Sequence, residues 1–273
     1  MTPSRDTFAF EEDTAVEKAG DDIFIANITD RWSIGGRPNG GYLMGAILTA
    51  LSDRLSNLNP LTSTGHFLAP AQPGPAEIRV NVIKEGRSLS TAQAILSQNG
   101  RARVAALATF GVLAAEGITR MAEGAPAQDG DLVSSIGRPT PFPIVDRFEF
   151  QMPAEQSRAA AGHPDDTDGP AEFVGTIRFA DGMAARPIAF PLLVDAFPPA
   201  VFRLGLIGWT PTLELTVHTR GQPAPGPVTL RVRSRFLIND LVEEDGELWD
   251  GSGALVGLSR QLAKIVVHPQ SAG

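Results

Sequence analysis

Three polar residues in the C-terminal half of the chain interrupt patterns that are otherwise apolar. Asp195 follows Leu-Leu-Val in a predicted helix, Thr216 lies in the first predicted strand after it, and Gln261 lies in a later strand. A charged or amide group on a buried surface destabilises the fold unless it is paired, so we expect Asp195 to have a partner. Burial also raises the pKa of a carboxylate, which makes it a better base. The three residues are therefore candidates for a catalytic site in which Asp195 acts as a base.

A glycine-rich turn in the N-terminal half could supply the complementary chemistry. Asn39-Gly40-Gly41-Tyr42 stands at the start of a predicted helix, where backbone N–H groups are free and the helix dipole is positive. Glycine at this turn lets a substrate approach the backbone closely. We expect the turn to bind substrate, with the amides of Gly41 and Tyr42 holding a developing oxyanion.

Each of the three polar residues also has a purely structural interpretation. Asp195 could cap a helix near the kink that Pro198-Pro199 imposes. Thr216 could be an ordinary strand residue, and Gln261 could face solvent at an edge. The functional interpretation depends on all three occurring together, in this order and on these elements.

An internal repeat indicates how the chain positions these residues. The segment His66–Val80 aligns without a gap on His218–Val232, and the offset of 152 residues superposes Pro-Gly-Pro and Arg-Val in the two copies. A repeat this long indicates two homologous domains and not a solenoid of small units. By this offset Asp195, Thr216 and Gln261 correspond to Leu43, Thr64 and Thr109.

Each copy is predicted to hold a helix followed by antiparallel strands. In the first copy a strand at Ile23–Ile28 precedes a helix over Tyr42–Leu55, whose apolar residues recur at helical spacing. The strands that follow are predicted over 77–85, 88–98 and 102–112, with turns at Gly86-Arg87 and Asn99-Gly100. The second copy is predicted to have a strand over 172–180, a helix over 191–206, and strands over 212–218, 228–240, 246–250 and 254–267, with turns at Asp245-Gly246 and 251–253.

The predicted domain boundaries follow from the irregular stretches. We expect an N-terminal domain over residues 1–113, a linker over 114–143, and a C-terminal domain over 144–273. A second irregular stretch, Ala159–Pro170, is interpreted as a solvated acidic loop and not as a metal site, because no other ligand-spaced residues flank it. Its candidate ligands are His163, Asp165, Asp166 and Asp168.

The composition excludes several classes of protein. The 273 residues carry 23 Lys and Arg against 31 Asp and Glu, and the net charge of -8 argues against nucleic-acid binding or a polybasic membrane patch. The chain has no cysteine for a disulfide or thiol nucleophile, and four histidines leave little material for a metal site. The acidic N-terminus has no basic start followed by an apolar run, so we expect no secretory signal. We also expect no membrane span, because the apolar runs look shorter than the roughly 20 residues that cross a bilayer. The sequence has no Gly-x-Ser-x-Gly elbow, no phosphate-binding glycine loop and no His-Glu-x-x-His pair. We expect a cytoplasmic protein that uses no metal or other cofactor.

The repeated unit resembles the hotdog fold, in which a curved antiparallel sheet wraps a long helix and buries its apolar stripe. Two tandem copies resemble the double hotdog of the type II acyl-CoA thioesterases, over most of the chain outside the linker. The expected fold class is therefore α+β, with a pseudo-dimer built into one polypeptide. Further assembly into a homo-oligomer is compatible with the sequence.

The resemblance implies a role for each candidate residue. In this family an Asp on the helix of the second half, a Ser or Thr in the following strand and a Gln in a later strand hold the hydrolytic water, and the matching positions are Asp195, Thr216 and Gln261. Asp195 would accept a proton from the water, while Thr216 and Gln261 would orient it toward the thioester carbonyl. That carbonyl is electrophilic enough for oriented water to suffice. One departure is that the Asp-His pair commonly found after the Ser or Thr is replaced by His218-Thr219.

Other residues keep two interpretations. Equivalent placement of His66 and His218 in the two copies favours a structural role for both, with His218 as a rival base. Several arginines could bind the phosphates of coenzyme A or could be plain surface charges, and three bulky aromatic residues could set the size of an acyl tunnel. These are Arg31, Arg37, Arg101 and Arg103, and Phe197, Phe202 and Trp209.

The activity that the resemblance implies is hydrolysis of an acyl-CoA thioester to the free acid and CoA, as in fatty acid metabolism. The alternative is a protein of the same fold that binds an acyl thioester or a small hydrophobic ligand without hydrolysing it. A hotdog dehydratase would need an Asp and a His placed together, and the sequence offers no such arrangement.

Overall fold

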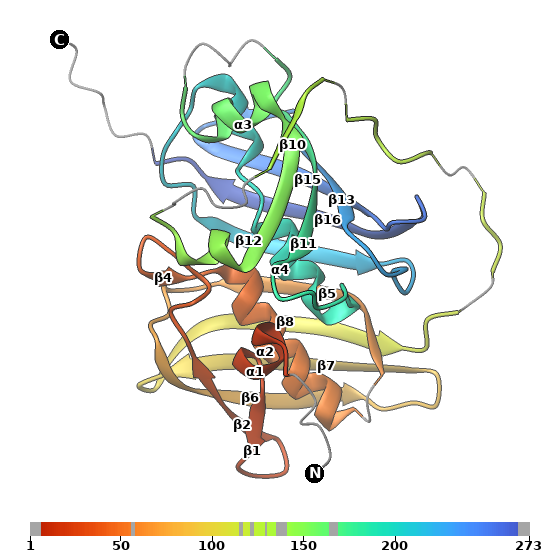
Figure 1. Cartoon of the computed structure of the whole chain (residues 1–273). Helices are drawn as coiled ribbons and strands as arrows, with labels where there is room; N and C mark the ends of the chain where they lie inside the picture. Colours follow the sequence, from red (N-terminus) through yellow and green to blue (C-terminus); the bar gives the residue numbers. More distant parts are fainter. Residues whose placement is uncertain are drawn as a thin grey trace, which may run out of the picture.

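The computed structural model describes residues 7–55, 58–114, 117–120, 123–128, 130–134, 141–163 and 169–266. Its main feature is a single sheet of 14 strands that passes through both halves of the chain, paired antiparallel throughout (Figure 1). The N-terminal half contributes, in spatial order, β1 (Val16–Lys18), β2 (Ile23–Ile28), β6 (Gly74–Lys84), β7 (Leu89–Gln98), β8 (Arg101–Gly111) and β5 (Asn59–Phe67). The sheet continues with β12 (Thr212–Thr219), β16 (Leu255–Lys264), β15 (Leu241–Trp249), β13 (Val228–Arg233), β11 (Glu172–Phe179), β10 (Phe148–Pro153) and β9 (Leu132–Ser134).

Few helices occur among the described residues, and two of them, α2 and α4, pack against each other where the two halves meet. The α-helices are α1 (Ala9–Asp13), α2 (Gly40–Arg54), α3 (Ala154–Ala160) and α4 (Phe190–Asp195), and the 3₁₀ helices are η1 (Pro143–Arg147), η3 (Pro187–Ala189) and η4 (Ala200–Leu204). Three short strands remain: β14 (Leu237–Ile238) pairs with β15, and β3 (Ser33–Ile34) pairs with β4 (Arg37–Pro38). The predicted tandem double hotdog is confirmed. Strand β9 lies inside the stretch predicted to be a linker and pairs with β10.

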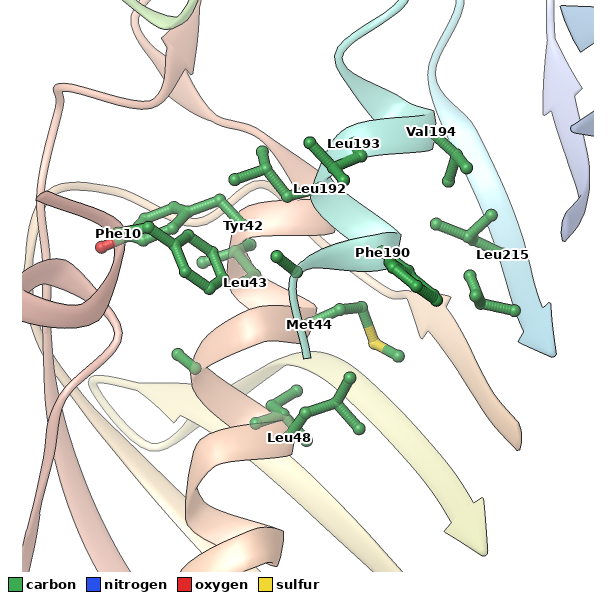
Figure 2. Packing of buried hydrophobic residues seen from close by; sticks show 14 of the residues in the cluster. Phe10, Tyr42, Leu43, Met44, Leu48, Phe190, Leu192, Leu193, Val194 and Leu215 are labelled. Carbon is green, nitrogen blue, oxygen red and sulfur yellow. The ribbon is translucent and has the colours of Figure 1, made fainter. Parts of the chain in front are cut away.

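Helix α2 is the central helix of the N-terminal half and matches the prediction closely. It begins after Asn39, whose Oδ1 accepts a hydrogen bond from the Tyr42 amide at 3.0 Å, which is the ordinary N-cap geometry. Strands β5 to β8 contact one side of it and α4 contacts another, which explains why almost every residue from Gly41 to Ser52 is buried. Figure 2 shows Leu192 of α4 beside the first turn of α2, and Val194 directed toward Leu215 of β12.

The second predicted helix is wrong in its extent. A continuous helix over Pro191–Leu206 is not formed, because α4 ends at Asp195 and the chain resumes as η4 at Ala200. Pro198 and Pro199 lie in the break, where they remove two backbone donors and disfavour helical geometry in the residues before them. Asp195 is therefore the last residue of a short helix and not an N-cap. One consequence is that η4, and not a regular helix, covers part of the inner face of the C-terminal sheet.

One predicted turn is also misplaced. The Asp245-Gly246 pair lies inside β15, and the chain reverses instead at Asn239 and Asp240, whose φ values are 53° and 62°. Asn and Asp tolerate this left-handed conformation better than most residues. The hairpin therefore begins β15 at Leu241, five residues before the predicted start, and brings Glu244 into the middle of the strand.

The two halves join edge to edge through β5 and β12. Thr64 pairs with Thr216 at this junction, which reproduces the offset of 152 found in the sequence. Each strand has an irregularity at the same place, between Pro60 and Thr62 and between Thr212 and Glu214. The neighbouring strands, β8 in the first half and β16 in the second, differ from the sequence offset by one residue. Thr64 pairs with Leu107, whereas Thr216 pairs with Arg260. The structural counterpart of Gln261 is therefore the buried Ala108 and not Thr109.

The hydrophobic core fills the space between the sheet and the central helices. One large cluster includes α2, α4 and the inner faces of both halves of the sheet, and a small second cluster of Val201, Val242, Ala263 and Ile265 lies under η4. The segment Pro187–Leu204 has the length and apolar composition of a membrane span, but 61% of it is buried within the protein. This burial is typical of a core segment.

Candidate active site

Asp195 contacts the N-terminus of α2 directly. Its Oδ2 accepts hydrogen bonds from the Asn39 side-chain amide at 2.7 Å and from the Gly41 backbone amide at 2.9 Å. The same Asn39 amide also donates to the backbone carbonyl of Asp195 at 3.1 Å. The expected partner of Asp195 is thus the turn that the sequence singled out as a substrate-binding element.

The environment makes Asp195 a base suited to neutral pH. Burial raises its pKa to about 6, while the hydrogen bonds from Gly41 and Asn39 oppose this rise because they stabilise the charged form. The positive end of the α2 dipole acts in the same direction as those bonds. The carboxylate is therefore ionised at pH 7 and still basic enough to accept a proton from water.

The glycines of the turn allow this contact between helices. A Cβ on Gly41 would lie 2.2 Å from the carbonyl oxygen of Pro191, so only glycine lets α2 and α4 approach each other here. A Cβ on Gly40 would lie 2.7 Å from the ring of Phe67 and 3.2 Å from Asp195 Oδ2. Both residues bring the backbone close to the carboxylate.

The backbone amides expected to bind an oxyanion have other partners in this structure. The Gly41 amide donates to Asp195 and the Tyr42 amide donates to Asn39 Oδ1 at 3.0 Å. The Tyr42 side chain is fully buried. Its hydroxyl accepts a hydrogen bond from the Thr29 backbone amide and donates one to the Asp13 backbone carbonyl, so its partners are residues other than Asp195. The turn therefore holds the Asp195 carboxylate, and its Gly41 and Tyr42 amides are not free to bind an oxyanion.

Gln261 faces the interior of the C-terminal half. It pairs with Leu215, which is 1% exposed, and directly opposed residues in antiparallel strands share a face. Its Nε2 donates to Glu244 Oε1 at 2.7 Å and its Oε1 accepts from the Thr212 hydroxyl at 3.1 Å. The interpretation of Gln261 as a solvent-facing edge residue is therefore wrong.

Thr216 does not lie on the same face of the sheet as Gln261, which corrects the sequence-based assignment. It lies one position from Leu215 and so occupies the outer face of the sheet, where its hydroxyl contacts Thr64 at 2.8 Å and Glu214 at 2.5 Å. His218 lies on the same outer face, which also removes it as a rival base beside Asp195. Because side chains alternate along a strand, Thr216 and Gln261 cannot hold one water together.

Two residues that the sequence analysis missed form hydrogen bonds with Gln261. Thr212 reaches the inner face because the irregularity between Thr212 and Glu214 reverses the alternation, which places Thr212 opposite the buried Ala263. Glu244 lies directly opposite Gln261 on β15, is 7% exposed, and its Oε2 accepts from the Ala200 amide at 2.6 Å. Burial raises the pKa of Glu244 to about 7, with a smaller contribution from the charge of Asp195. A polar residue at an inner-face position of β15 was the available signal, but the misplaced turn concealed it.

The other candidates have varied placements. Arg31 pairs with Asp13 and Glu12, so it is not free for phosphate, whereas Arg37 lies 4.9 Å from the ring centre of Trp209. Phe197 is buried and its ring centre lies 5.8 Å from that of Phe150. Within the described ranges the structure contains no cluster of three or more His, Asp or Glu residues that could hold a metal. Asp165, Asp166 and Asp168 lie outside those ranges.

Comparison with protein families identifies both halves. Residues 28–111 match the acyl-CoA thioesterase N-terminal domain and residues 121–265 match the acyl-CoA thioesterase C-terminal domain. A protein of Mycobacterium tuberculosis with no assigned function, Rv0499, is 24% identical over 280 residues, which cover 89% of this chain and 91% of the relative.

Solved structures give the same result. A crystal structure of a protein from Thermobifida fusca assigned to thioesterase II is 31% identical, with a TM-score of 0.87 and coverage of 96% of this chain and 99% of that one. The acyl-CoA thioesterase II TesB2 of Mycobacterium marinum has a TM-score of 0.71 at 18% identity, covering 96% of this chain and 99% of its own, which shows the shared fold.

Proposed function

Since the chain belongs to the acyl-CoA thioesterase family, we propose that it hydrolyses acyl-CoA thioesters with water activated by Asp195. The observation that carries the proposal is the Asp195 carboxylate, held at the N-terminus of α2 by Asn39 and Gly41 with its pKa raised to about 6. This is a general base that needs no metal and no covalent nucleophile.

The reaction has two steps. Water attacks the thioester carbonyl carbon as one of its protons passes to Asp195, and a tetrahedral intermediate forms. The intermediate then collapses, the C–S bond breaks, and the leaving sulfur takes the proton from Asp195, which restores the carboxylate. The products are a free acid and CoA, and the enzyme returns to its starting protonation state.

The remaining roles follow from hydrogen-bonding capacity. The Thr212 hydroxyl donates to Gln261 Oε1, so its oxygen can accept the second hydrogen of the attacking water. Gln261 donates one Nε2 hydrogen to Glu244, which leaves the other for the oxyanion. In this proposal Thr212 takes the role first expected of Thr216, and Gln261 replaces the turn amides as oxyanion donor.

The test is thiol release from a panel of acyl-CoAs of different chain length. The chain has no cysteine, so a thiol-specific chromogenic reagent detects CoA without background from the protein. We expect turnover by the native protein, and a loss of about 10²-fold to 10⁴-fold in kcat for Asp195→Asn with the fold retained. Binding of the panel without thiol release would instead support a non-hydrolytic binding protein, and full activity of Asp195→Asn would remove Asp195 from the mechanism.

The family also suggests the wider setting. We propose that the chain acts in the cytoplasm on acyl-CoAs of fatty acid metabolism. Identical turnover of acyl-CoA and acyl-carrier-protein thioesters in the same panel would contradict CoA as the preferred carrier.

A further inference from the structure

Glu244 is a buried carboxylate that takes no direct part in the proposed reaction. It is 7% exposed, and both of its oxygens accept hydrogen bonds, Oε1 from Gln261 Nε2 at 2.7 Å and Oε2 from the Ala200 amide at 2.6 Å. The part of the chain that the structure describes gives Glu244 no ion pair with a lysine or arginine. A buried carboxylate without a cation is costly, so its retention calls for an explanation.

The bonds around Gln261 define which way its amide points. An amide has a donor end and an acceptor end of nearly the same shape, and only its neighbours distinguish them. The carboxylate of Glu244 can only accept, so it selects the Nε2 end. The Thr212 hydroxyl then donates to Oε1, which leaves one Nε2 hydrogen without either partner.

The opposite half of the molecule supports a link between these residues and the base. At the corresponding positions the chain has Leu43 for Asp195, Ala108 for Gln261 and Ala92 for Glu244, and all three are buried. Glu244 and Gln261 thus occur in the half that carries the carboxylate, and both are replaced by alanine in the half that lacks it. A role limited to binding η4 would account for Glu244 alone, because the first half has the continuous helix α2 in place of η4, but it would not account for Gln261.

We propose that Glu244 is a positioning residue, which fixes the Gln261 amide so that one Nε2 hydrogen is presented to the oxyanion of the substrate. The inference rests on the proposed hydrolysis. Glu244 itself does not touch the substrate, and it acts through Gln261. Its second bond, to Ala200, holds η4 in place and is the structural role from which the positioning role has to be separated.

Glu244→Gln makes that separation. The Ala200 amide is a fixed donor, so the oxygen of the introduced side-chain amide will face it and the introduced NH₂ group will face Gln261. Gln261 can then satisfy all bonds by rotating its amide through 180°, with Oε1 toward the substituted side chain and Nε2 toward Thr212. The variant keeps the contact to η4 and the shape of the site, but presents an acceptor where the native protein presents a donor.

We expect Glu244→Gln to fold normally and to lose about 10²-fold in kcat, as is typical for loss of an oxyanion donor, with KM within about threefold of native. In a Gln261→Ala background the same substitution should change kcat by less than about twofold, because the amide it orients is gone. Asp245→Asn, which removes a neighbouring carboxylate on the outer face, is the matched control and should keep kcat within about twofold of native. Native-like kcat in Glu244→Gln would overturn the proposal, as would equal losses in the native and Gln261→Ala backgrounds.

A second measurement is independent of turnover. The side-chain NH₂ resonances of Gln261, assigned by their disappearance in Gln261→Ala, should shift strongly between the native protein and Glu244→Gln, because a carboxylate acceptor is lost. Unchanged resonances would overturn the inference even if no acyl-CoA is hydrolysed. Failure of the proposed function would instead appear as an inactive native protein, so the two results are distinguishable.

Discussion

The hydroxyl of Thr64 lies 2.8 Å from the hydroxyl of Thr216, and the two residues occupy the same position in the two halves of the chain. This pair marks the pseudo-twofold axis, where β5 and β12 join the halves into one sheet. Since both hydroxyls lie on the outer face, the pair belongs to the junction between the halves and not to the reaction site.

Exchange of threonine for valine distinguishes the two candidate hydroxyls. Thr216→Val should leave kcat within about twofold of native and cost about 1 kcal/mol of stability through the lost hydrogen bonds. Thr212→Val should lower kcat by about tenfold or more, since it removes the acceptor for the attacking water. Steady-state kinetics on one acyl-CoA and urea denaturation of both variants check this, and the reverse order of the two kcat values would restore Thr216 to the site.

The pH dependence of kcat/KM should show an acidic limb. Asp195 must be ionised to accept a proton, and its pKa is raised to about 6 by burial. Glu244, with a pKa raised to about 7, must also be ionised because both of its partners are donors. Activity should therefore fall as the pH drops from 8 to 5, in a limb that becomes less steep in Glu244→Gln. A flat profile across this range would contradict a carboxylate base.

Asp195→Asn should lose activity but not stability. The folded protein binds the Asp195 proton more tightly than the unfolded chain, in which the pKa is near 3.8, so ionisation above pH 6 destabilises the fold. The asparagine variant avoids this cost and should be more stable by roughly 1–3 kcal/mol at pH 8, with the difference shrinking toward pH 4. Thermal unfolding at both pH values measures the difference. A variant that is less stable at pH 8 would show that weaker hydrogen bonds from Asn39 and Gly41 cost more than removal of the buried charge gains.

Gly41→Ala should separate α2 from α4. The added Cβ would lie 2.2 Å from the Pro191 carbonyl oxygen, so backbone must move, at a cost of about 2–4 kcal/mol. Gly20→Ala is the control, because its Cβ would meet nothing closer than 3.6 Å and should change stability by less than about 0.5 kcal/mol. Chemical denaturation of both proteins is the measurement. Equal stabilities would mean that the helix contact is not tight.

Much of the architecture could be predicted from the sequence because local signals and the repeat agree. The helix over α2, the strand Ile23–Ile28 and the hairpin at Asn99-Gly100, with φ values of 52° and 71°, all follow from periodicity and turn chemistry. Asp195 and the turn at Asn39 were expected to serve one site, but not to be hydrogen-bonded to each other. Their direct contact depends on how two helices from distant parts of the chain pack.

The rest of the site depends on single-residue shifts that periodicity cannot reveal. The irregularity after Thr212 exchanges the inner and outer faces of β12, so the threonine that contacts Gln261 is four positions before the one predicted. The turn at Asn239 and Asp240 competes with the stronger Asp245-Gly246 signal, and the error removed Glu244 from the strand in which it faces Gln261. A shift of one residue changes the face of every side chain that follows it.

In a dimer of identical subunits, equivalent positions always carry the same residue. Here both halves belong to one polypeptide, so equivalent positions can differ, and Asp195 in one half corresponds to Leu43 in the other. An inhibitor that mimics the tetrahedral intermediate should consequently saturate at one equivalent per polypeptide. The equivalent region of the other half is free to evolve solely as scaffold.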